Sequence, residues 1–167
     1  MNIKHSYYFF KKAIPKKICN QIIKKYSKRP LQKGTTKGSL TNIRDSEIVF
    51  TSEPKLYDLI HPYVHKANED SGWNFQWDHT EPFQFTKYAL NEHYNWHTDG
   101  APTPYSDPTK KGMYGKIRKL STVVSLVDKS KYVGGDFQLD LRNKEIDFTK
   151  NVDQIDVRNI ITLKELD

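Results

Sequence analysis

A histidine and an aspartate two positions apart, His97 and Asp99, are the residues of this 167-residue chain best suited to carry chemistry. In an extended strand, side chains two residues apart point to the same face, so both can reach one metal ion. An imidazole and a carboxylate, completed by a second histidine, form the three-ligand face that holds Fe(II) in non-haem oxygenases. The pair therefore predicts a metal site on a strand.

Four short segments in and around this pair carry a further pattern. They are Gln-Phe-Thr-Lys-Tyr at 84–88, His-Tyr-Asn-Trp-His-Thr-Asp at 93–99, Arg-Lys-Leu-Ser at 118–121 and Tyr-Val-Gly-Gly-Asp-Phe at 132–137. Taken together, their order and spacing resemble the 2-oxoglutarate- and Fe(II)-dependent dioxygenases of the prolyl 4-hydroxylase type. The resemblance runs from about residue 82 to residue 141, and extends more loosely to the residues before it.

This resemblance implies roles for three residues. His97 and Asp99 correspond to the first two iron ligands, and Tyr88 corresponds to the tyrosine that hydrogen-bonds 2-oxoglutarate. The implied cofactors are Fe(II), 2-oxoglutarate as cosubstrate and ascorbate. The implied reaction hydroxylates a C–H bond of a peptide, a protein or a small molecule, with a peptidyl proline as the first candidate. The loop at 100–119 is expected to close over that substrate.

One ligand of the family pattern has no counterpart in the chain. The third iron ligand is a histidine on a later strand, followed by a Lys or Arg that pairs with the far carboxylate of 2-oxoglutarate, yet no histidine follows His97. His93 lies about 13 Å from His97 along an extended strand, too far for a shared metal unless the chain bends. His79 can approach only through tertiary folding. We therefore expect an incomplete dioxygenase domain that binds Fe(II) weakly and turns over little 2-oxoglutarate.

The implied fold is a double-stranded β-helix, a jelly-roll or cupin-like barrel with N-terminal helices packed on it. Local patterns agree with an α+β chain. Apolar residues recur every fourth position at 14–29, which predicts a helix with Pro15 in its first turn. A second helix is expected from Ser52 as its cap to about residue 69, with Pro62 as an irregularity inside it.

The remaining patterns favour strands. They are expected at 47–51, 73–78, 82–89, 120–127 and 136–142. The last two strands are expected to pair in antiparallel fashion through a turn at 132–135. We expect a single incomplete domain, 1–167, with a helical part at 1–72 and a β-barrel part at 73–167 whose C-terminal strands are missing.

Composition argues against a membrane protein and favours a cytoplasmic one. No apolar run approaches the roughly 20 residues of a membrane-spanning helix, and no apolar core of a signal peptide follows the N-terminus. Cys19 is the only cysteine, which fits a reducing compartment.

Positive charge is concentrated in the first quarter of the chain. Residues 1–44 carry ten Lys and two Arg without an acidic residue, in a chain of net charge +7. We expect a solvated lysine surface rather than a nucleic-acid partner. Two alternative functions stay open: a catalytically dead jelly-roll binding module, favoured by the missing histidine, and a nucleic-acid dealkylase of the same fold, which would use the basic N-terminal part.

Overall fold

A computed structural model describes residues 5–34, 43–100 and 103–140 of the chain, together with the backbone of 160–163. In chain order, its elements are α1 (Lys16–Tyr26), β1 (Gln32–Lys33), β2 (Arg44–Asp45), β3 (Glu47–Thr51), α2 (Pro54–Asp70), β4 (Phe83–Lys87), β5 (His93–Tyr94), the 3-10 turn η1 (Lys129–Lys131), β6 (Phe137–Asp140) and β7 (Ile160–Leu163). The expected α+β class is therefore confirmed.

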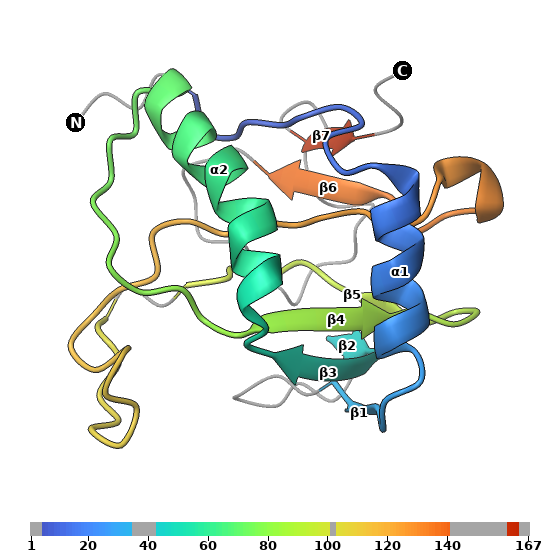
Figure 1. Cartoon of the computed structure of the whole chain (residues 1–167), viewed down its shortest axis with the longest axis horizontal. Coiled ribbons are helices and arrows are strands. Elements are labelled where there is room, and N and C mark those ends of the chain that lie inside the picture. Colours follow the sequence, from blue (N-terminus) through green and yellow to red (C-terminus); the bar gives the residue numbers. More distant parts are fainter. Residues whose placement is uncertain (1–4, 35–42, 101–102, 141–159, 164–167) are drawn as a thin grey trace.

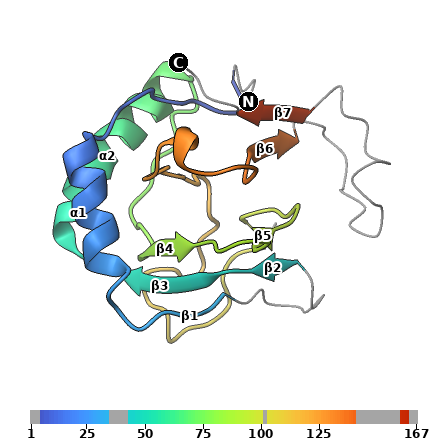
Figure 2. The same ribbon diagram turned by 90° about the vertical axis from the view of Figure 1, so that its right-hand side faces the viewer.

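The two helices lie side by side along one flank of the fold (Figure 1). Seen from the side, β6 and β7 lie toward one end of the molecule and β1 to β5 toward the other (Figure 2). The described strands form three small antiparallel sheets, none of them closed into a barrel: β1-β3-β4, β2-β5 and β6-β7. Within this described part, neither helix has the length and apolar character needed to cross a membrane.

Both predicted helices are confirmed, although their ends differ from the prediction. Pro15 is the N-cap of α1 and not a residue of its first turn. Helix α1 ends at Tyr26, three residues before the predicted end at residue 29. The chain turns there, and the Tyr26 carbonyl accepts from the Arg29 N–H at 3.1 Å. Glu53 takes the N-cap position of α2 in place of Ser52, and Pro54 occupies the first turn.

Pro62 lies inside α2 without ending the helix. Tertiary contacts hold the segment on both sides of it. Ile60 and Ala67 are buried. The Tyr63 hydroxyl donates to the Ala13 carbonyl at 2.7 Å, and its ring meets that of Phe10 edge-on. Packing of this face therefore outweighs the hydrogen bond that the proline cannot make.

We expect the substitution Pro62→Ala to stabilise the chain by about 1–2 kcal/mol. Alanine restores a backbone N–H inside the helix and removes the clash of the proline ring with the preceding turn. Urea unfolding followed by circular dichroism measures the change. The matched variant Pro54→Ala should have little effect, because a first-turn N–H has no partner within the helix. Equal or lower stability of Pro62→Ala would contradict this account.

The central strand of the largest sheet is β3, which coincides with the predicted 47–51. It pairs with β1 on one side and β4 on the other, with Val49 opposite Phe85. Strand β4 lies within the predicted 82–89. This sheet pairs strands that precede residue 72 with a strand that follows it. The predicted division into a helical part at 1–72 and a β-barrel part at 73–167 stays a prediction.

The predicted strand at 73–78 is wrong, because these residues have no regular secondary structure. The Asn68 side chain supplies the reason. Its amide oxygen accepts from the Phe75 N–H at 3.0 Å, and its amide nitrogen donates to the Phe75 carbonyl at 2.8 Å. Both backbone groups of Phe75 are thereby used by a side chain instead of a neighbouring strand.

The predicted strand at 120–127 is wrong as well. The segment is irregular and largely exposed, with Val123 at 64% exposure. Strand propensity reflects packing on a half-buried sheet face, which this segment does not have. Strand β6 instead pairs with β7, with Leu139 opposite Ile161. Residues 141 and 142 of the predicted strand 136–142 lie outside the described residues.

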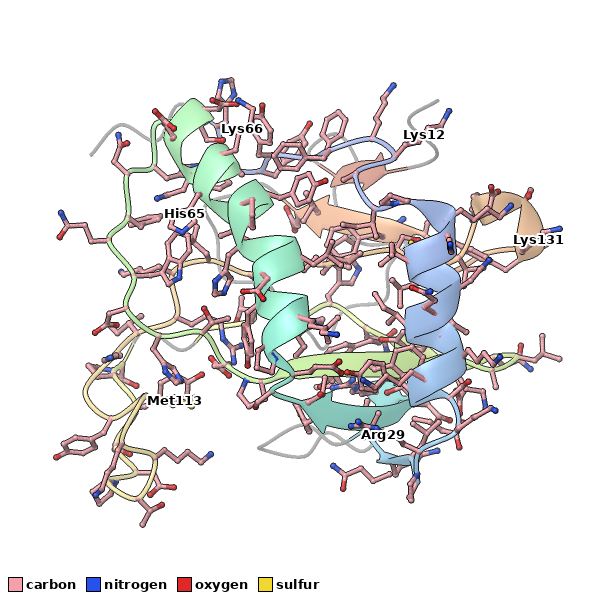
Figure 3. All side chains as sticks on the ribbon, viewed as in Figure 1. Lys12, Arg29, His65, Lys66, Met113 and Lys131 are labelled. Carbon is pink, nitrogen blue, oxygen red and sulfur yellow. The ribbon has the colours of Figure 1, made fainter. Side chains whose placement is uncertain are left out.

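A small core lies between the helices and the largest sheet. Its buried apolar members are Cys19, Tyr26, Ile48, Ile60 and Ala67. Tyr26 is the largest, at 1% exposure, and its ring stacks on that of Phe85 at 5.7 Å. By contrast, the basic side chains of Lys12, Lys66 and Lys131 lie at the periphery of the fold (Figure 3).

Candidate metal site

His97 and Asp99 lie in the loop that follows β5, so the prediction that they share a strand is wrong. Pairing with β2 continues only as far as the Asn95 N–H, which donates to the Ile43 carbonyl at 2.7 Å. The Asn95 carbonyl is then bonded by the His97 Nδ1 at 2.7 Å. The His97 side chain therefore uses a backbone carbonyl that, in a continuing strand, would accept a hydrogen bond from the neighbouring strand.

The two side chains nevertheless converge, as the metal hypothesis requires. His97 Nε2 lies 3.1 Å from Asp99 Oδ1. Ligands in neighbouring positions of an octahedron, each about 2.1 Å from the metal, lie about 3 Å apart. With Nδ1 bonded to the Asn95 carbonyl and Nε2 bonded to the Asp99 carboxylate, both ring nitrogens donate, as in the protonated imidazole, and a metal would take the place of the proton on Nε2. The pair therefore fits two positions of an Fe(II) site.

Electrostatics couples these two groups. The hydrogen bond from His97 is the main cause that lowers the pKa of Asp99 to about 2, against the effect of burial. Burial lowers the pKa of His97, but its hydrogen bonds to Asp99 and the Asn95 carbonyl outweigh burial and leave the pKa above its ordinary value. Asp99 is therefore ionised at neutral pH, as a metal ligand must be.

Two residues of the 118–121 segment hold Asp99 in place. The Ser121 hydroxyl donates to Asp99 Oδ2, and Arg118 Nη1 donates to the Asp99 backbone carbonyl. Arg118 is itself fixed by Glu81 through two parallel bonds of 2.8 and 2.6 Å. In the sequence, this segment stands out only as part of the family resemblance. Its contacts with Asp99 could not be read from spacing alone.

We expect Glu81→Gln to destabilise the chain by about 1–2 kcal/mol at neutral pH, because Arg118 would lose a half-buried, bidentate partner. Arg118 is the main cause that lowers the pKa of Glu81 below the ordinary 4.5. The stabilisation is thus present above that value and is lost as the pH falls further through the lowered pKa. Urea unfolding at about pH 7 and about pH 3 should show the difference between variant and parent shrinking in acid. The exposed Glu69→Gln is the control and should leave the stability within about 0.5 kcal/mol of the parent.

An aromatic and cationic stack lies behind the imidazole. The Tyr94 ring stacks on the His97 ring, with centroids 3.5 Å apart and planes 9° apart. The Arg44 guanidinium lies over the same Tyr94 ring, 4.6 Å from its centroid. Arg44 and Tyr94 are directly opposite each other in the β2–β5 pair. Neither residue is predictable as a neighbour of His97 from the sequence, because their contact depends on strand register.

Tyr88 follows β4 by one residue and is 48% exposed. Its hydroxyl has no hydrogen bond to another of the described residues. Burial of the other half raises its pKa, while the nearby charge of Arg44 lowers it. The structure therefore places Tyr88 within the electrostatic reach of Arg44, and its contact with 2-oxoglutarate stays a prediction.

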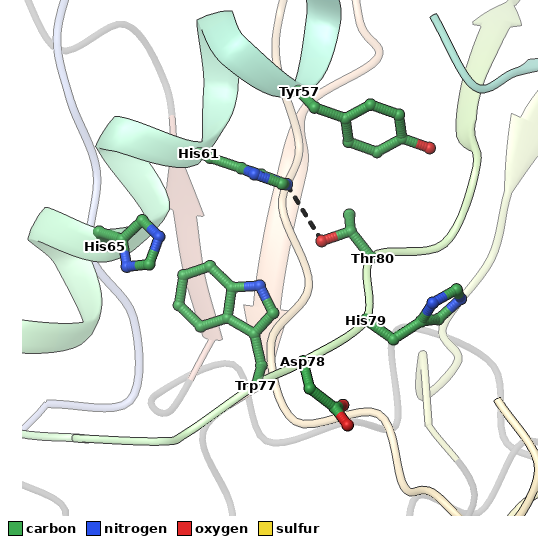
Figure 4. A pocket seen from close by; sticks show the side chains of 7 residues that line it. All are labelled: Tyr57, His61, His65, Trp77, Asp78, His79 and Thr80. Atoms are coloured by element: carbon green, nitrogen blue, oxygen red, sulfur yellow. Dashed lines mark hydrogen bonds between the residues drawn. The ribbon is translucent and has the colours of Figure 1, made fainter. Parts of the chain in front are cut away.

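No third protein ligand joins the pair among the described residues, which contain no group of three His, Cys, Asp or Glu able to hold a metal. His93 lies on β5 with its Nδ1 3.4 Å from the Asn91 carbonyl. His79 packs against Gly112. It lines a separate pocket of about 370 Å³ with His61, His65 and Trp77 (Figure 4).

Comparison of the chain with protein-family models, with curated proteins and with solved structures finds no match.

Proposed function

We propose that this chain is an Fe(II)- and 2-oxoglutarate-dependent dioxygenase of the prolyl 4-hydroxylase type, with the jelly-roll fold of that class. The observation that carries the proposal is the 3.1 Å approach of His97 Nε2 to Asp99 Oδ1, with Nδ1 held by a backbone carbonyl. The antiparallel pairing of every described strand is compatible with the fold. The substrate class is a peptide, a protein or a small molecule, and a peptidyl proline is the first candidate.

The residues of the site have separate tasks in this function. His97 and Asp99 would hold the metal, while Ser121 and Arg118 keep the carboxylate in position. When bound, Fe(II) with 2-oxoglutarate supplies the oxidation by dioxygen that hydroxylates a C–H bond and releases succinate and carbon dioxide. Ascorbate would keep the metal reduced. Tyr88 would donate to 2-oxoglutarate, as the resemblance implies.

Binding of Fe(II) in the presence and absence of 2-oxoglutarate tests this function. Two protein ligands hold a metal weakly, so a chelating cosubstrate that adds two donor atoms should raise the apparent affinity for Fe(II) about tenfold or more. Anaerobic equilibrium dialysis measures the bound iron, and assay of succinate measures turnover, which we expect to be low. Iron binding that is indifferent to 2-oxoglutarate, with no succinate formed, would contradict the proposal.

A catalytically dead binding module of the same fold is the second candidate. The observation that favours it is the lack of a third ligand among the described residues. The same dialysis separates the two functions, because a metal-free module would bind no iron at His97 and Asp99.

A further inference from the structure

Residues 120–127 are a run of strand-forming residues without a neighbouring strand. Their sequence is Leu-Ser-Thr-Val-Val-Ser-Leu-Val, in which half of the residues are β-branched. Within the described part of the chain, none of their backbone N–H or C=O groups pairs with the backbone of another residue. The preference of the segment and its surroundings therefore conflict, and natural chains keep such conflicts mainly at functional sites.

The structure holds this segment at both ends. Near its start, the Ser121 hydroxyl donates to Asp99. Just beyond its end, the Asp128 carboxylate accepts from the Ser130 N–H at 3.0 Å and thereby caps η1. Between these two points the chain runs across the width of the fold to η1 (Figure 1). A segment that is already held in place loses less conformational freedom when it pairs with a partner.

The apolar side chains of this region are open to solvent. Half of the exposed large apolar side chains among the described residues lie between 123 and 137, and they are Val123, Val124, Val127, Tyr132, Val133 and Phe137. Proteins protect exposed strand edges with charged residues and prolines, yet residues 120–127 contain neither. The segment is therefore suited to accept a further strand.

The order of the residues favours a second copy of the same segment as that strand. Two copies can pair in antiparallel fashion around a twofold axis between residues 123 and 124, as a symmetric dimer requires. Three of the four kinds of cross-strand pair then match in polarity, and they are Val123 with Val124, Thr122 with Ser125, and Leu120 with Val127. In the fourth pair, Ser121 with Leu126, the serine hydroxyl is already bonded to Asp99.

The charges that flank the segment favour the same register. Lys119 lies opposite Asp128 of the partner subunit, once at each end of the paired strands. Lys119 is exposed and has no ion pair with another described residue. The next pair outward, Arg118 with Lys129, has like charges, but each of these residues is already paired with a carboxylate of its own chain. A shift of register by one residue would separate Lys119 from Asp128.

We propose that residues 120–127 pair in antiparallel fashion with the same segment of a second copy of this chain, around a twofold axis between Val123 and Val124. Eight residues on each side are fewer than in a typical stable interface, so the dimer is weak, with a dissociation constant of about 10–100 µM. The inference does not depend on the proposed function, because the pairing needs neither a metal nor a cosubstrate.

Sedimentation velocity of the full chain, from about tenfold below to about tenfold above this concentration, tests the inference. We expect the mass to rise from that of one chain to that of two. Val123→Lys brings two like charges close to the twofold axis and should weaken the dimer at least about tenfold. Val133→Lys is the matched control, because Val133 is a fully exposed valine outside the segment, and it should dimerise as the parent does.

Cross-linking through cysteines tests the register. In the proposed pair, residue 123 of one copy and residue 124 of the other point to the same face, whereas the two copies of residue 123 point to opposite faces. A mixture of Val123→Cys and Val124→Cys chains should therefore form a disulfide between unlike chains under a mild thiol oxidant, and either variant alone should not. The native Cys19 is buried and does not interfere.

The outcomes that overturn the inference are distinct. They are a chain that stays monomeric at every concentration, including one that binds a foreign peptide at this segment, a dimer that tolerates Val123→Lys, and association that continues beyond two copies. Cross-linking that ignores the predicted pairs overturns it as well. Iron binding at His97 and Asp99, measured by dialysis, can stand in each of these cases, so failure of the dimer is distinguishable from failure of the proposed function.

Discussion

Replacement of Asp99 by alanine is expected to lower the affinity of the chain for Fe(II) by at least about 100-fold. Asp99 would supply one of only two protein ligands among the described residues, and it is the one that carries a negative charge. Removing it leaves a single imidazole. Anaerobic equilibrium dialysis measures the loss, with parent and variant compared at the same pH because the affinity of an imidazole ligand for a metal depends on pH.

Two further variants show whether the loss is local to the site. Ser121→Ala removes the hydroxyl that donates to Asp99 Oδ2, and should weaken iron binding about tenfold, as loss of an outer hydrogen bond does at other metal sites. His93→Ala removes an exposed imidazole from β5 and should leave the affinity unchanged. Iron binding that survives Asp99→Ala but falls with His93→Ala would place the metal elsewhere.

Replacement of Tyr26 by alanine is expected to destabilise the chain by about 3–5 kcal/mol. Tyr26 is 1% exposed and links three elements. Its ring stacks on Phe85 of β4. Its hydroxyl donates to Glu53, at the start of α2, at 2.6 Å and shares a hydrogen bond of 3.2 Å with Thr51 of β3. The variant would lose the stacked ring and leave a cavity.

Urea unfolding followed by circular dichroism measures this effect. Tyr26→Phe keeps the ring and loses only the hydroxyl bonds, so it should cost about 1–2 kcal/mol. Lys25, 2.5 Å from the Glu53 carboxylate, still pairs with that group. Leu90→Ala, at a residue 91% exposed, should stay within about 0.5 kcal/mol of the parent. A Tyr26→Ala variant as stable as Leu90→Ala would contradict the packing described here.

Local patterns predicted best the helices and strands in which the apolar residues that recur in the sequence are the ones that face the core. The helices around Ile22 and Ile60 and the strand 47–51 belong to this group. The strand predicted at 73–78 failed because one polar side chain, Asn68, bonds both backbone groups of Phe75. The strand predicted at 120–127 failed because its β-branched residues have no covering layer. Neither circumstance is visible in a sequence window.

The sequence by itself determined that an imidazole and a carboxylate two residues apart can meet, since that contact is local. This contact does not require a strand, because the loop after β5 brings His97 Nε2 and Asp99 Oδ1 to 3.1 Å. Only the tertiary structure decided what surrounds them. The β2–β5 register places Arg44 opposite Tyr94, and packing of the 118–121 segment brings Ser121 to Asp99. These contacts join residues far apart in the chain, and their energies depend on burial, which only the packed fold creates.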